Sequence, residues 1–82
     1  MSLKNLGQIT KEHEENVIAA IRGILKQEED RDEVYGDDQI ADMLRSSGLL
    51  VSKNSIYKLR AKHDIPNSRE RAIVNFAKRH RN

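Results

Sequence analysis

The sequence predicts an all-α fold, a small bundle of about four helices. Apolar residues recur at helical spacing in several segments, and each of these segments is bordered by residues that start or stop helices. The only β-like run, at residues 49–51, is too short to pair alone. A chain of 82 residues makes one domain at most, so its apolar core should be small.

The first helix is expected at residues 11–29. Residues 1–9 show no clear periodicity and are interpreted as a flexible leader, so the domain itself would span residues 10–82. Thr10 is a plausible N-cap, and three glutamates near the start of the helix complement its dipole. The stripe expected to be buried consists of Val17, Ile18, Ile21, Ile24 and Leu25.

Two short helices joined by a tight turn are expected within residues 37–66. Asp37 or Asp38 would cap the first of them, whose apolar face contains Ile40, Met43 and Leu44. Gly48 stands where a left-handed residue would end this helix. The second helix would begin after Ser52 as its N-cap, bury Ile56 and Leu59, and end before Pro66. A basic second helix after a glycine turn indicates a helix-turn-helix motif, which places that helix in the DNA major groove.

A fourth helix is expected at residues 68–78. Asn67 and Glu70 form a capping-box pattern at its start. The apolar residues expected to face inward are Ile73, Phe76 and Ala77, and five arginines or lysines at residues 69–81 make this C-terminal part of the chain basic. Ile65, just before Pro66, is expected to turn back into the core.

Charge is distributed unevenly along the chain. Residues 1–42 carry 5 Lys or Arg and 11 Asp or Glu, a net charge of −6, whereas residues 43–82 carry 10 and 2, a net charge of +8. This asymmetry favours a nucleic-acid-binding face with an acidic region kept away from it, although unevenly placed surface charges would give the same totals.

Several other classes of function lack support in the sequence. There is no cysteine, the three histidines lie far apart, and neither a glycine-rich phosphate loop nor a nucleophile elbow is present. We therefore expect no catalytic residue, no metal site and no cofactor. The apolar runs are too short to span a membrane, and a cytoplasmic location is expected.

Three short motifs follow one another at fixed spacing. They read Ile-Ala-Asp-Met-Leu at residues 40–44, Ser-Lys-Asn-Ser-Ile-Tyr-Lys-Leu-Arg at residues 52–60, and Asp-Ile-Pro-Asn-Ser at residues 64–68. Residues 20–72 thereby resemble the C-terminal DNA-binding domain of the sigma-54 family of bacterial transcription initiation factors. That family has Ile-Ala-Glu-Leu-Leu, the signature box Ala-Arg-Arg-Thr-Val-Ala-Lys-Tyr-Arg and Gly-Ile-Pro-Ser-Ser at the same spacing.

The resemblance implies promoter binding at a −24 element within a sigma factor. In the box, Lys58 and Arg60 are identical to the family pattern, whereas Lys53 and Asn54 replace its arginine pair and Leu59 its tyrosine. The activator-responsive and polymerase-binding regions of a full sigma factor do not fit in this chain. It is therefore either a fragment of a larger factor, the interpretation we favour, or a stand-alone relative.

The resulting hypothesis is sequence-specific binding of double-stranded promoter DNA. The residues expected to contact DNA are Ser52, Lys53, Asn54, Ser55, Tyr57, Lys58, Arg60, Lys62, Arg69 and Arg71. RNA polymerase core would be reached through a parent protein. The alternative is a helical protein-interaction module whose acidic first helix docks on polymerase or another basic partner. A dimer would need an exposed apolar patch, and the sequence does not indicate one, so we expect the domain to bind DNA as a monomer. The glutamates of the first helix are expected to face away from DNA, because carboxylates repel phosphates.

Overall fold

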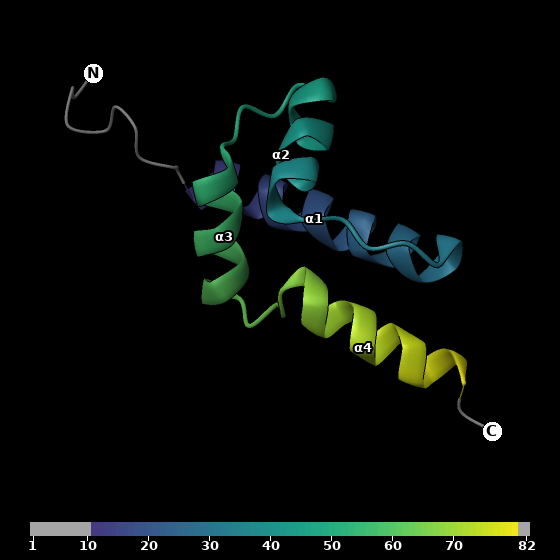
Figure 1. Cartoon of the computed structure of the whole chain (residues 1–82). Helices are drawn as coiled ribbons and strands as arrows, with labels where there is room; N and C mark the ends of the chain where they lie inside the picture. Colours follow the sequence, from purple (N-terminus) through teal and green to yellow (C-terminus); the bar gives the residue numbers. More distant parts are fainter. Residues whose placement is uncertain (1–10, 81–82) are drawn as a thin grey trace, which may run out of the picture.

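The computed structural model describes residues 11–80, which form four α-helices and contain no strand. The helices are α1 (Lys11–Arg31), α2 (Asp37–Ser46), α3 (Lys53–Lys62) and α4 (Ser68–Arg79). Helices α2 and α3 pack across the N-terminal half of α1, and α4 lies beside its C-terminal half (Figure 1). The expected all-α fold with a helix-turn-helix is therefore confirmed. The expected leader at residues 1–9 lies outside the described residues.

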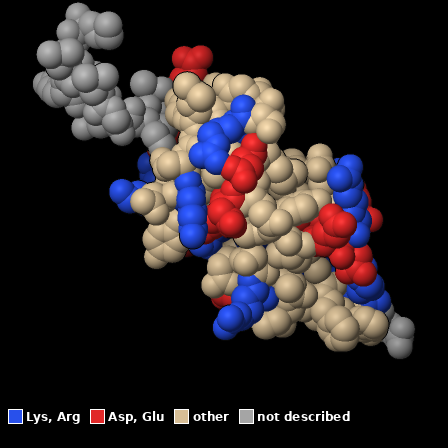
Figure 2. All heavy atoms as spheres, turned by 45° about the horizontal axis from the view of Figure 1, so that its top comes forward, with Lys and Arg blue, Asp and Glu red and all other residues tan. Residues whose placement is uncertain are grey.

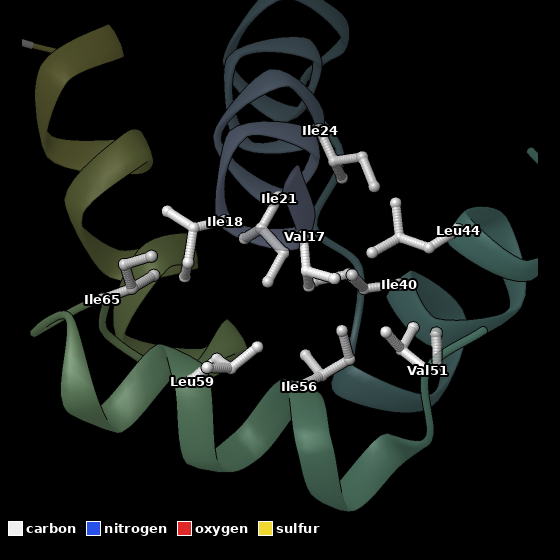
Figure 3. Packing of buried hydrophobic residues seen from close by; sticks show 11 residues of the cluster. Val17, Ile18, Ile21, Ile24, Ile40, Leu44, Val51, Ile56, Leu59 and Ile65 are labelled. Carbon is white, nitrogen blue, oxygen red and sulfur yellow. The ribbon is translucent and has the colours of Figure 1, made fainter. Parts of the chain in front are cut away.

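The apolar core lies where α1, α2 and α3 meet (Figure 3). It also includes Ile65, which turns back toward the core after α3 as expected. The core residues are Val17, Ile18, Ile21, Ile24, Ile40, Ala41, Leu44, Val51, Ile56, Leu59 and Ile65. Their helical spacing in the sequence explains why each helix is amphipathic and why these three helices form one unit.

The turns between helices follow from local backbone chemistry. Gly48 has φ of +98°, and its N–H and that of Leu49 donate to the carbonyls of Arg45 and Leu44 at the end of α2. This is a Schellman motif, and it ends α2 where the sequence places the stop. At the start of α3, the Ser52 side chain accepts from the Ser55 N–H at 3.1 Å, and Asn67 and Glu70 form the expected capping box of α4.

The expected end of α1 and the expected cap of α2 differ in the structure, and α4 continues one residue further than expected, to Arg79. Helix α1 continues to Arg31, where Asp32 takes a left-handed conformation (φ 58°) and ends it. Helix α2 is capped by Gly36 rather than by an aspartate side chain, because Gln39 reaches back to accept from the Gly36 N–H at 2.9 Å. Asp37 is thereby left free to pair with another helix.

The expectation for α4 is wrong in orientation. Ile73, Phe76 and Ala77 face solvent, with Ile73 65% and Phe76 63% exposed. The opposite face contacts α1 through Arg71, which is 5% exposed. The surface of α1 beside it carries Glu28 and Glu29, so the basic face of α4 docks there and the apolar face turns outward. The premise for expecting a monomer, that no apolar patch is exposed, is wrong as well, and the oligomeric state stays a prediction.

Candidate nucleic-acid interface

Helix α3 has one exposed face that is shared by four of the residues expected to contact DNA. Lys53, Asn54, Tyr57 and Lys58 are all exposed, whereas Ile56 and Leu59 anchor the opposite face in the core. Because helical residues three or four apart are neighbours, these side chains form one continuous surface of about two turns. An α-helix fits the major groove of B-DNA, so this surface is suited to reading base edges.

Two of the residues expected to contact the DNA backbone are buried, so their assignment to phosphate contacts is corrected. Arg60 is 7% exposed, and its guanidinium donates to both carboxylate oxygens of Asp37 at 3.1 and 3.2 Å. Arg71 donates to both oxygens of Glu28 at 2.8 and 2.9 Å. A buried charge is stable only with such partners, so neither arginine is available to a phosphate in this fold.

The remaining residues expected to contact DNA lie at the edges of the exposed face of α3. Ser52 is exposed at the N-cap, and Ser55 is half-buried with its hydroxyl 3.2 Å from that of Ser52. Lys62 is exposed at the end of α3, and its ammonium lies 2.8 Å from a carboxylate oxygen of Glu14. Arg69 is exposed in the first turn of α4, where its guanidinium can reach solvent.

Folding brings the acidic and basic halves of the chain together. Ion pairs join Asp37 to Arg60, Glu14 to Lys62, Glu28 to Arg71, Glu29 to Lys78 and Asp32 to Arg79. Figure 2 shows the result, with acidic side chains lying among the basic ones instead of one unbroken basic area. The acidic region is therefore not kept apart from the basic one. The net charge of each half of the sequence overstates the electrostatic field on the folded surface, because opposite charges pair with each other.

Three cations of the basic half have no ion pair within residues 11–80, and two of them are on the exposed face of α3. They are Lys53, Lys58 and Arg69. An unpaired lysine keeps its full charge for an incoming phosphate, whereas a paired one must first lose its partner. The exposed face of α3 formed by Lys53, Asn54, Tyr57 and Lys58, called the recognition surface below, thus carries two of these three unpaired charges.

Glu14 links α1 to the end of α3 and was not singled out from its neighbours by the sequence. Its carboxylate contacts the Lys62 ammonium and also lies 3.0 Å from the imidazole Nε2 of His63. Hydrogen bonds from Lys62 and His63 lower the pKa of the Glu14 carboxyl. Glu14 therefore lies at the C-terminal end of α3, and the expectation that the glutamates near the start of α1 face away from DNA stays a prediction.

The lowered pKa of Glu14 predicts a pH-dependent part of the stability. A carboxyl whose pKa falls on folding stabilises the native state above its ordinary pKa of 4.5, and this contribution is lost as the pH falls through the lowered value. The difference in Tm between the wild type and Glu14→Gln, measured by circular dichroism, should therefore shrink on acidification from about pH 6 to about pH 3. Glu15→Gln, which changes an exposed neighbour, serves as control. A Tm difference for Glu14→Gln that is constant with pH would contradict the assignment.

Other kinds of site lack support within residues 11–80. No three His, Cys, Asp or Glu side chains of this segment come together in a way that could hold a metal ion. None of its helices is long and apolar enough to cross a membrane.

A basic, exposed helix that follows a glycine turn and packs on a preceding short helix defines the helix-turn-helix class of DNA-binding domains. The sequence model described as "Sigma-54, DNA binding domain" matches residues 2–73, which is most of the chain. The chain therefore belongs to the sigma-54 DNA-binding domain family, and DNA binding of the sigma-54 type is its role. Searches of curated proteins and of solved structures find no match to it.

Proposed function

We propose that this chain binds double-stranded promoter DNA by placing α3 in the major groove, as the domain that recognises the −24 element for a sigma-54 factor. The observation that carries the proposal is the exposed face of α3, where unpaired Lys53 and Lys58 flank Asn54 and Tyr57. Lysines at the edges of such a surface hold phosphates and fix the register, and the polar and aromatic side chains between them meet base edges.

The salt dependence of binding tests this proposal. If Lys53, Lys58, Arg69 and Lys62 meet phosphates, log K should fall with log salt with a slope of about −3 to −4. Lys53→Ala should weaken binding to all sequences alike and reduce the slope by about one. Fluorescence anisotropy with a labelled duplex measures both quantities.

The matched control is Lys78→Ala. Lys78 is an exposed lysine near the C-terminal end of α4, and it pairs with Glu29 of α1. This substitution should leave affinity and slope almost unchanged. A wild-type affinity that does not respond to salt would refute the proposal.

Asn54 is proposed to read adenine where relatives read guanine. The family's box has an arginine at this place, and arginine matches the O6 and N7 acceptors of guanine, whereas asparagine pairs best with adenine N6 and N7. Ser52 caps α3, and the exposed side chain of Asn54 makes no hydrogen bond within residues 11–80. This arrangement supports base reading over helix capping.

Selection of bound sites from a random duplex pool should show this preference. The wild type should select adenine at one position, Asn54→Arg should move the preference there toward guanine, and Asn54→Ala should lose about 1–3 kcal/mol of discrimination. Asn16→Arg adds the same charge at an exposed place on α1 and should leave the selected sequence unchanged. Identical sites for wild type and Asn54→Arg would rule out base reading by this residue.

A contact with RNA polymerase core through a parent protein is the second candidate. The exposed apolar side chains of α4, Ile73 and Phe76, favour a protein-binding surface there. The acidic helix α1 is a weaker docking surface than its sequence indicates, because Glu14, Glu28 and Glu29 already pair with cations of this domain. Retention on immobilised polymerase core, compared between the wild type and Phe76→Asp, tests this candidate.

A further inference from the structure

Arg60 is buried beneath the recognition surface and touches one of its members. The guanidinium carbon lies 5.5 Å from the centre of the Tyr57 ring, which is within the range of a cation–π contact. Tyr57 is one turn before Arg60 on α3 and is 58% exposed. One part of the ring therefore rests on the arginine, and the rest is open toward the DNA-binding side.

The guanidinium is itself held in place by three hydrogen bonds to two partners. Both Asp37 oxygens accept from it, and Nη1 donates to the backbone carbonyl of Ile65 at 3.1 Å. Asp37 is in the first turn of α2 and Ile65 follows α3, so the anchor connects both helices of the motif. A planar group fixed by three hydrogen bonds forms a rigid support, and a ring resting on it loses less freedom when it binds.

The ring has a chemical preference in the major groove. The Tyr57 side chain is exposed, and its hydroxyl makes no hydrogen bond within residues 11–80. The edges of base pairs in this groove carry hydrogen-bonding groups and one apolar group, the C5-methyl of thymine. An exposed, immobilised aromatic surface between Asn54 and Ala61 is complementary to that methyl group.

We propose that the Asp37–Arg60 pair fixes the ring of Tyr57 as a reader of a thymine methyl group. This inference rests on the proposed placement of α3 in the major groove. Tyr57 would be a second specificity-determining residue beside Asn54, and Asp37 and Arg60 would be positioning residues that do not touch DNA. It also gives the buried Arg60 a role that a direct phosphate contact cannot provide.

Replacement of single thymines by deoxyuridine isolates this contact, because it removes only the methyl group. In the site selected by the wild type, one such replacement should weaken binding about fourfold, the factor expected for one buried methyl group. The same replacement should have no effect on Tyr57→Ala and should keep its effect on Tyr57→Phe, which retains the ring. Tyr57 is exposed, so these variants should fold, and circular dichroism checks that they do.

The positioning role is tested by a double-mutant cycle. Asp37→Asn should reduce the deoxyuridine penalty toward zero in the wild-type background, and should add no further loss of affinity in the Tyr57→Ala background. Arg60→Lys keeps the charge without the fork and should behave like Asp37→Asn. Additive losses, with the penalty retained in folded Asp37→Asn or Arg60→Lys, would mean that the pair is only structural. If both variants unfold, NMR tests the contact itself. The Tyr57 ring should shift the signals of the Arg60 side chain upfield, and this shift should be lost in Tyr57→Ala. An unchanged shift overturns the proposal.

The outcomes separate this inference from the proposed function. The methyl-reading role alone is overturned if the wild type selects a site but shows no deoxyuridine penalty at any thymine. It is also overturned if the penalty is still present in Tyr57→Ala. A wild type that selects no site and binds no duplex overturns both.

Discussion

Replacement of Glu28 by alanine is expected to destabilise the domain by about 3–5 kcal/mol, the typical cost of breaking a buried ion pair. Glu28 is 1% exposed and accepts from the Arg71 guanidinium and from the Tyr35 N–H at 2.8 Å. Removing the carboxylate would leave a buried arginine charge and a backbone N–H without their partner. For a domain of this size the loss is a large part of the total stability. Urea unfolding measures it.

The neighbouring glutamate provides the control for this experiment. Glu29 pairs with Lys78 on the same two helices, but both side chains are about half exposed. An exposed ion pair contributes about 0–1 kcal/mol, so Glu29→Ala should change the unfolding midpoint little. Equal effects of the two substitutions would show that Glu28 is not the buried attachment of α4.

Replacement of Leu44 by alanine is expected to cost about 2–5 kcal/mol. Leu44 is 3% exposed and packs in the core where α2 meets α1 and α3. Truncation leaves a cavity that the surrounding isoleucines cannot fill without moving, and so small a domain should be largely unfolded by it. A thermal melt measures the effect.

Leu50 provides the matched control for this prediction. It is 82% exposed in the turn before α3, so Leu50→Ala should leave the melt nearly unchanged. A melt that Leu44→Ala does not shift would contradict the helical register of α2.

Most of the fold could be predicted because local chemistry and tertiary packing agree in α1 to α3. The apolar stripe of α1, the Gly48 stop and the Ser52 cap each determine one feature by themselves. Prediction failed at α4, where the apolar stripe is regular but the neighbouring surface of α1 is acidic. Periodicity identifies the apolar face of a helix and does not specify which face its neighbour accepts.

For a related reason, the exposure of the candidate site residues could be predicted only in part. Exposed Lys53, Asn54, Tyr57 and Lys58 could be read from their spacing opposite Ile56 and Leu59. The buried arginines could not be separated from exposed ones by residue type. Arg60 follows Ile56 and Glu28 follows Ile24 by four residues, the position at which an apolar stripe continues, but Arg22 follows Ile18 in the same way and is exposed. The spacing alone therefore does not identify a buried charge.

The way in which α4 is attached implies two levels of cooperativity in this small protein. Helices α1 to α3 share one apolar core, whereas α4 is held to α1 by polar contacts centred on Arg71 and exposes its own apolar residues. Segments that bury little apolar surface open at lower free energy than the core they rest on. Helix α4 can therefore detach as a separate unit, and its amide protons will exchange with solvent through openings that leave the helix-turn-helix motif folded.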